Sequence, residues 1–171
     1  NTDFITNLEY VSIHAPFLGQ DGKNFLYEKN TVTKNVLNHL KDIHYHYNAK
    51  HIVFHPDLII DFHLIENMGV KILLENLPAN SGYKNEELTE IFKKFPDFGM
   101  VLDVTHALTF GQDYMKKLIK EFRDKIKQVH LSYTDDLGYG GKRQHLPIST
   151  CKDMSVFSDV LSLNCPIIIE S

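Results

Sequence analysis

The stretch GMVLD, residues 99–103, is a short apolar run of β-prone residues that ends in a side chain able to bind a divalent metal. Five further runs carry a histidine or a carboxylate at or next to their ends: YVSIH (10–14), HIVFH (51–55), KILLE (71–75), KQVHL (127–131) and PIIIE (166–170). Parallel strands gather the groups at their carboxyl ends on one rim, where barrels and open α/β sheets build active sites. The pattern predicts a metalloenzyme.

The segments between these runs have the features of helices. Helices are predicted at about 31–47, after Pro56-Asp57 with Asp57 as N-cap, and at about 85–94, 112–124 and 151–162. Strands that alternate with single helices are parallel and joined by right-handed crossovers. An open doubly wound sheet usually carries a glycine-rich phosphate loop after its first strand, and neither GxGxxG nor GxxxxGK occurs here. The prediction is therefore an α/β fold, a (β/α)8 TIM barrel that is incomplete: six βα units are seen, and the first two strands and the last helix are missing.

The composition of the chain predicts one cytoplasmic domain over residues 1–171. Its 171 residues, 43% of them hydrophobic, suffice for a single core, and a net charge of -4 provides no overall basic field for non-specific nucleic-acid binding. Cys151 and Cys165 lack metal-ligand spacing and do not form a disulfide framework, so a reducing compartment is expected. No apolar stretch approaches the roughly 20 residues that span a bilayer, so no membrane partner is expected.

Candidate ligands follow the apolar runs. Glu75 and Glu170 each end such a run, where a buried carboxylate is costly unless it is paired or bound to a metal. Either carboxylate could bind a cation or act as a base. Imidazoles at the strand ends, on His14 and His55, suit several transition metals without distinguishing among them.

Further candidates lie later in the chain. Asp103 and His106 form a D-x-x-H pair at a turn from strand to helix, and His130 lies within QVHLSY. A polar loop ends in His145, and its Lys142 and Arg143 could hold a phosphate or carboxylate of a substrate, arginine through a bidentate fork. A solvated basic loop is the alternative interpretation of these two cations.

Taken together, the motifs SIHAPF, VFHP, ILLEN, VLDVTHA, VHLS, RQHLPI and IIIES resemble the xylose isomerase-like TIM-barrel superfamily. That superfamily includes sugar and sugar-phosphate isomerases and epimerases, and endonuclease IV-like apurinic-site nucleases. The resemblance to the isomerases implies one catalytic metal, with ligands Glu75, Asp103, His130 and Glu170. Zinc or manganese is the expected ion, with cobalt or magnesium as alternatives.

The resemblance to the nuclease branch implies a cluster of three zinc ions, to which His14, His55, His106 and His145 would add ligands. The nuclease pattern has an aspartate two residues before the loop histidine, where this chain has Arg143. It also has an Asn-Asp-Ser type sequence after the strand histidine, where this chain has Leu131, Ser132 and Tyr133. A cation at a cation-binding position opposes a third metal.

Three hypotheses follow. In the first, the protein is a metal-dependent isomerase or epimerase of a sugar or sugar phosphate, with Glu75 and Glu170 as catalytic residues and with His106, Lys142 and Arg143 contacting the substrate. In the second, it is a zinc-dependent phosphodiesterase that cleaves DNA at abasic sites. In the third, it is a non-catalytic remnant that binds a metal or metabolite. The sequence does not specify the oligomeric state.

Overall fold

The computed structural model describes residues 8–135 and 143–170. The chain divides into two compact units, unit 1 with residues 1–74 and 91–98, and unit 2 with residues 75–90 and 99–171. Each unit is described by itself. Strands alternate with helical segments along both, as the spacing of the apolar runs predicts.

Unit 1 contains a parallel sheet in which the strand order follows the chain. The strands are β1 (Ser12–His14), β2 (His51–Phe54) and β3 (Ile72–Glu75), and the last residue of β3 already belongs to unit 2. In the register, Ile13 lies beside Ile52, and Val53 lies beside Leu73. β2 and β3 are apolar and almost wholly buried, as parallel strands covered on both faces are.

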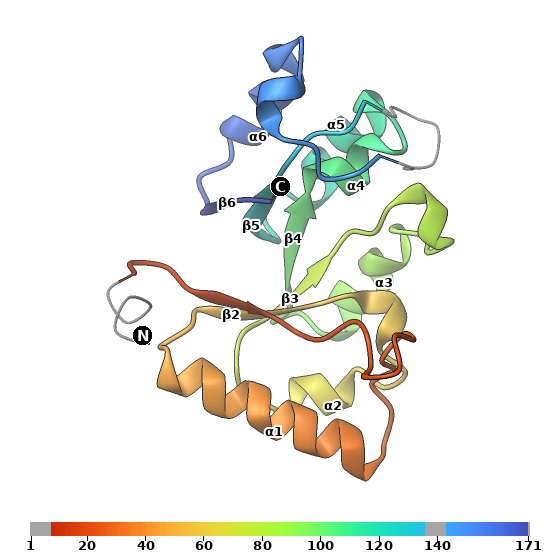
Figure 1. Cartoon of the computed structure of the whole chain (residues 1–171), viewed down its shortest axis with the longest axis vertical. Coiled ribbons are helices and arrows are strands. Elements are labelled where there is room, and N and C mark those ends of the chain that lie inside the picture. The colour runs from red at the N-terminus through yellow and green to blue at the C-terminus, as the bar shows by residue number, and fades with distance from the viewer. Residues whose placement is uncertain (1–7, 136–142, 171) are drawn as a thin grey trace. The chain divides into compact units, whose positions relative to one another are not determined.

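Two helices lie along the same side of β2 (Figure 1). Helix α1 (Thr31–His46) begins where Oδ1 of Asn30 accepts a hydrogen bond from the backbone N–H of Thr33 at 2.7 Å, and α2 (His63–Glu66) is a single turn. The prediction that Asp57 caps a helix is wrong. Asp57 lies inside the 3-10 turn η2 (Pro56–Leu58), because Pro56 starts that turn directly after His55.

Unit 2 contains a second set of three parallel strands, β4 (Gly99–Asp103), β5 (Ile126–Leu131) and β6 (Ile167–Ile169). The register between β4 and β5 shifts at Met100 and Val101, so that Asp103 pairs with His130. Because paired residues of neighbouring strands lie side by side, these two predicted ligands meet at the carboxyl end of the sheet.

The helical segments of unit 2 are short except for α5 (Gln112–Phe122), whose buried face includes Met115, Leu118 and Phe122. Helix α4 (Val104–Leu108) follows β4 directly, and α3 (Glu87–Lys94) has residues in both units. The remaining segments are η3 (Ala79–Ser81), η4 (Ile148–Thr150), η5 (Met154–Phe157) and α6 (Ser158–Leu161).

The single helix predicted at 151–162 is wrong. The side chain of Asp153 accepts a hydrogen bond from the N–H of Ser155 at 3.0 Å, which starts the helical segment late and as a 3-10 turn, η5, before α6 completes it. Phe157 and Val160 are nevertheless buried, so the apolar spacing did identify a packed face. No helix in the described ranges is long and apolar enough to cross a bilayer.

Candidate metal centre

Three predicted ligands of unit 2 converge at the carboxyl ends of their strands. Glu75 ends β3, Asp103 ends β4 and His130 lies next to the end of β5, and each offers a ligand atom within 4.8 Å of the other two. Their exposed fractions are 2%, 0% and 3%. Two carboxylates and an imidazole removed from water this completely are costly unless they share a positive charge.

Asp103 provides the test of whether a metal fits. Its Oδ1 accepts the N–H of His106 at 2.7 Å and caps α4, while its Oδ2 is buried with no hydrogen-bond partner among the described residues. Burial raises the pKa of Asp103 to about 7, with contributions from Glu75 and Glu170 and against the opposing effect of His106. A divalent cation at Oδ2 would give this buried oxygen a partner and would stabilise the ionised form of the carboxylate. The residues therefore fit a metal with oxygen and nitrogen ligands.

Glu170 extends this group from the residue after β6. Its Oε1 lies 3.0 Å from Nδ1 of His130, and Oε2 of Glu75 lies 3.5 Å from the same nitrogen. Burial lowers the pKa of His130, but the two carboxylates outweigh it and raise that pKa to about 10. Burial would raise the pKa of Glu170, yet His130 brings it below its usual value. Nδ1 of His130 therefore faces the acidic centre.

His106 lies against the same carboxylates, on α4. Its Nδ1 donates a hydrogen bond to the backbone carbonyl of Asn76 at 2.9 Å and lies 3.3 Å from Oε1 of Glu75. Burial lowers the pKa of His106, but Asp103 and Glu75 outweigh it and raise that pKa to about 9. A histidine whose one nitrogen donates to a carbonyl offers the other nitrogen to a metal or a substrate.

His145 reaches this region from the loop before η4. Its ring centroid is 5.3 Å from that of His106, and its Nδ1 lies 3.2 Å from Oγ of Ser132 and 3.6 Å from Oε2 of Glu170. The backbone of His145 is left-handed, with φ of 54°, which is uncommon outside glycine and is often found at functional sites. Asp103, His106 and His145 form a second set of ligand atoms within 4.8 Å of one another.

Two buried amide side chains that are not among the predicted site residues hold this centre in place. Asn76 bridges the backbone of Asp103 twice, donating from Nδ2 to the carbonyl at 3.0 Å and accepting the N–H at Oδ1 at 2.8 Å. Gln128, two residues before His130, lies against Nε2 of that imidazole at 2.7 Å. Their positions in the sequence are the signal that could have indicated these roles. Asn76 directly follows Glu75, and Gln128 lies on the same strand face as His130.

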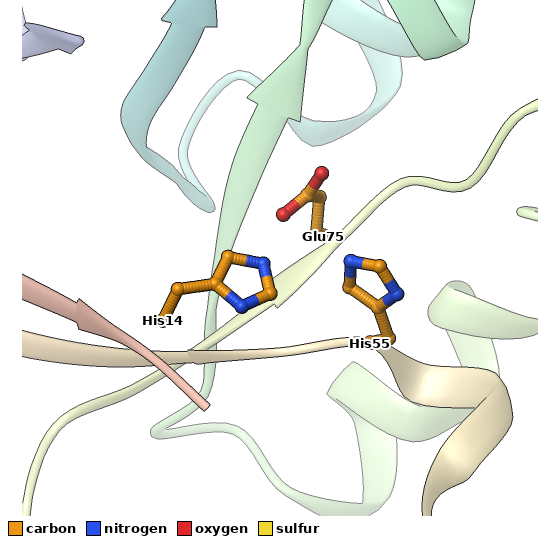
Figure 2. A group of neighbouring side chains, drawn as sticks. All are labelled: His14, His55 and Glu75. Carbon is orange, nitrogen blue, oxygen red and sulfur yellow. The ribbon is translucent and has the colours of Figure 1, made fainter. Parts of the chain in front are cut away.

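The two histidines predicted at the first strand ends belong to unit 1. His14 ends β1 and His55 follows β2, and their ring centroids lie 5.0 Å apart with the planes at 82°; Figure 2 labels both, together with Glu75 of unit 2. Phe17 stacks on His55 at 5.4 Å, and Nδ1 of His14 donates to the carbonyl of Ala15 at 2.8 Å. Their assignment to a metal stays a prediction.

The two predicted substrate cations, Lys142 and Arg143, precede His145 closely in the sequence. Arg143 is exposed, and its guanidinium pairs with Asp135 at 2.8 Å. Its backbone carbonyl accepts a hydrogen bond from Oγ1 of Thr134 at 2.6 Å. Lys142 lies outside the described residues. The role of both cations in substrate binding stays a prediction.

Comparison with known families decides what kind of barrel this is. The profile of the family described as "Xylose isomerase-like TIM barrel" matches residues 59–170, more than half of the chain. The chain belongs to this family. The match includes β3 to β6 and so covers Glu75, Asp103, His106, His130, His145 and Glu170.

Solved structures share the xylose isomerase-like fold at low sequence identity. A xylose isomerase domain protein from Planctomyces limnophilus has a TM-score of 0.62 and 14% identity, with 94% of this chain and 70% of that chain covered. A probable 3-DHS dehydratase, AsbF, involved in petrobactin synthesis in Bacillus anthracis has a TM-score of 0.59 and 12% identity, with 95% and 69% covered. A protein from Thermus thermophilus, in a crystal soaked with ZnCl2, has a TM-score of 0.55 and 19% identity, with 80% and 63% covered. No curated protein matches the sequence.

These comparisons confirm the predicted superfamily and the predicted fold class of a xylose isomerase-like TIM barrel. The six strands of the described residues are two fewer than the eight of a complete barrel. In this fold the active site lies at the carboxyl ends of the strands, which is where Glu75, Asp103 and Glu170 lie.

Proposed function

We propose that the protein is a divalent metal-dependent isomerase or epimerase that acts on a sugar or sugar phosphate. The observation that carries the proposal is the convergence of two carboxylates, from Glu75 and Glu170, on one side of His130. Moving a proton between neighbouring carbons of a sugar needs a base and an acid close to one bound substrate, and a carboxylate can serve as either.

The four residues Glu75, Asp103, His130 and Glu170 would hold the metal. When bound, a zinc or manganese ion would polarise a carbonyl or hydroxyl oxygen of the substrate and make the neighbouring C–H group more acidic. The buried Oδ2 of Asp103 and Nδ1 of His130 would supply two of the ligand atoms for such an ion.

The two glutamates differ in their access to a substrate. The side chain of Glu75 is 3% exposed and that of Glu170 is 32% exposed. His130 keeps the pKa of Glu170 below its usual value in the metal-free centre, against the effect of burial, and a bound divalent cation would likewise favour the ionised carboxylate, which can accept a proton. Glu170 would take the proton from the substrate carbon, and Glu75 would hold the metal and stabilise the charge that develops.

His106 would orient the substrate. Its Nδ1–H is committed to the carbonyl of Asn76, so the other ring nitrogen is the atom available to a substrate hydroxyl.

Exchange of substrate hydrogen with solvent deuterium tests the proposed proton transfer. The full protein, loaded in turn with Zn, Mn, Co and Mg, is incubated with panels of aldoses, ketoses and their phosphates in D2O, and exchange is followed by NMR. We expect exchange with at least one substrate, and its loss in Glu170→Gln at saturating metal. The exposed Glu87→Gln is the matched control. Absence of exchange on every panel would overturn the proposal.

A second candidate, a zinc-dependent phosphodiesterase acting at abasic sites in DNA, is favoured by a separate observation. Asp103, His106 and His145 form a second ligand set that shares Asp103 with the first, so the centre could hold two ions. Two neighbouring ions suit in-line attack on a phosphate. Nicking of a duplex with one abasic site, with two or more zinc ions per chain, would support this candidate. An uncut duplex would exclude it.

A further inference from the structure

Gln128 is a buried polar side chain in the middle of strand β5, of whose six residues only Lys127 is exposed. Gln128 is 0% exposed, and its Nε2 lies 2.7 Å from Nε2 of His130. Residues two apart on a strand point to the same face, so the contact follows from the strand geometry once both side chains are turned inward. A buried amide is costly unless it is hydrogen-bonded, so its pairing with the histidine accounts for its place in the core.

The contact determines which imidazole nitrogen faces the acidic centre. Because Nε2 of His130 lies against Gln128, Nδ1 is the nitrogen directed at Oε1 of Glu170 (3.0 Å) and Oε2 of Glu75 (3.5 Å). Rotation of the ring by half a turn about its Cβ–Cγ bond would break the contact of Nε2 with Gln128 and the contacts of Nδ1 with the two glutamates. Gln128 thus selects the orientation of His130 in which Nδ1 is the ligand atom.

An amide suits this position better than the carboxylate or carbonyl that usually supports a metal-bound histidine. When Nδ1 binds a metal, or when the ring is protonated, Nε2 carries a hydrogen and needs an acceptor. When a neutral ring carries its hydrogen on Nδ1, Nε2 needs a donor. The glutamine amide offers N–H or C=O from the same place by a half-turn of its last torsion angle. It also adds no further negative charge beside Glu75, Asp103 and Glu170.

We propose that Gln128 is a positioning residue that holds His130 with Nδ1 toward the metal and supports Nε2 in both the metal-bound and the metal-free centre. This inference rests on the proposed metal centre. Gln128 is not itself a ligand, but it controls the metal affinity and the tautomer of the ligand His130. Outer partners of this kind are typically worth roughly 10–100-fold in metal affinity.

The test compares Gln128→Met, which keeps the length of the side chain without hydrogen bonds, with Gln128→Glu, which keeps an acceptor. The dissociation constant for Co2+ is measured by titration of its visible absorption, and the tautomer of His130 is read from two-bond 1H–15N NMR couplings. Gln112→Met, an identical change at an exposed position, is the matched control, and circular dichroism verifies the fold.

We expect Gln128→Met to bind Co2+ about 10–100-fold more weakly, with an altered absorption band and an altered His130 tautomer. We expect Gln128→Glu to restore binding, because the glutamate can still accept the Nε2 hydrogen. If Gln128→Met binds Co2+ as the wild type does with an unchanged spectrum, the inference is overturned while the metal centre stands. If the wild type binds no Co2+, the metal centre itself fails. If Gln128→Met does not fold, failure of the folded Gln128→Glu to bind would overturn the inference.

Discussion

The strand ends of unit 1 and unit 2 carry similar residue types in very different surroundings. In unit 1, His14 is exposed and His55 is half-buried against Phe17, and both are neutral groups when unprotonated. In unit 2, three ionisable side chains are at most 3% exposed and so are buried away from solvent: Glu75, Asp103 and His130. An exposed imidazole can stay neutral, whereas buried carboxylates need a positive charge beside them, either from a protonated histidine or from a metal ion.

Burial separates the candidate ligands that need a compensating positive charge from those that do not. The sequence presents His14 and Asp103 alike, as ligand types at the ends of apolar runs. Burial distinguishes them, because Oδ2 of Asp103 lacks a hydrogen-bond partner among the described residues and the pKa of this carboxyl is raised to about 7. The proposed metal centre therefore lies in unit 2, and a metal-binding role for His14 and His55 of unit 1 stays a prediction.

The largest expected effect is that of Asp103→Asn. The change keeps a side chain that can cap α4 but removes the charge that a metal would bind, and breaking a buried charge pair costs about 3–5 kcal/mol. We expect metal affinity to fall by about 100-fold to 4,000-fold, because each factor of ten is about 1.4 kcal/mol. Isothermal titration with Zn2+ or Mn2+ measures it, with the exposed Asp97→Asn as control. An unchanged metal affinity in Asp103→Asn would contradict the inference that the buried carboxylates of unit 2 bind the metal.

Alanine at His130, compared with alanine at His14 or His55, tests the comparison directly. His130→Ala should weaken metal binding by about 100-fold, because it removes a ligand whose Nδ1 lies at the centre of the carboxylates. His14→Ala and His55→Ala should change metal affinity by less than about threefold, because substitutions of residues that are not ligands usually shift free energies by no more than about 0.5 kcal/mol. Equal losses of metal from all three variants would show that unit 1 supplies ligands.

Asn76→Ala should destabilise unit 2 by about 2 kcal/mol. The change leaves the buried N–H and C=O of Asp103 without their side-chain partners, and each unsatisfied buried group costs about 1–3 kcal/mol before any relaxation. Urea unfolding followed by circular dichroism measures the loss. The exposed Asn38→Ala should stay within about 0.5 kcal/mol of wild type. A similar effect of the two changes would mean that the amide bridge does not hold β4.

The smallest effect concerns Tyr27, a buried residue of unit 1 whose hydroxyl donates to the carbonyl of Pro16 at 2.8 Å. Tyr27→Phe should cost about 1 kcal/mol at pH 7. Burial raises the pKa of Tyr27, so the folded state keeps the phenol proton at a pH where the unfolded chain, with a pKa near 10, loses it. The stability that the neutral phenol contributes is complete below about pH 10 and is lost as the pH rises further.

The difference in unfolding free energy between wild type and Tyr27→Phe should therefore shrink between about pH 9 and pH 11, a window set by the unfolded-state pKa. Urea titrations at several pH values measure it, and the exposed Tyr45→Phe is the control. A difference that is constant across this range would argue against a buried neutral phenol at position 27.

The fold was predictable because its strands coincide with short apolar runs, and the segments between these runs have apolar residues that recur with the period of a helix. Five residues of β4 and four of β2 lie inside the predicted runs, and the register of the parallel strands then brings Asp103 beside His130. The boundaries were less predictable where one side chain decides them. Asp153 starts a 3-10 turn in place of the predicted helix at 151–162.

The ligand types of the site were predictable, and the residues that hold them were not. Glu75 and Asp103 are evident because a carboxylate follows an apolar run, whereas Gln128 and Asn76 resemble any polar residue beside a strand. Their roles arise from contacts across 27 residues, between Asn76 and Asp103, and from the direction of one imidazole ring. Such contacts follow from the three-dimensional register and not from spacing along the chain.

The metal content of the purified protein and of Asp103→Asn, measured by elemental analysis after dialysis against a weak chelator, tests the metal centre most directly. We predict about one Zn or Mn ion per wild-type chain and less than about one tenth of an ion in the variant, a ratio set by the affinity loss expected for Asp103→Asn. A wild-type protein without metal, or a variant that keeps its ion, would contradict the claim that the buried carboxylates of unit 2 form a metal centre.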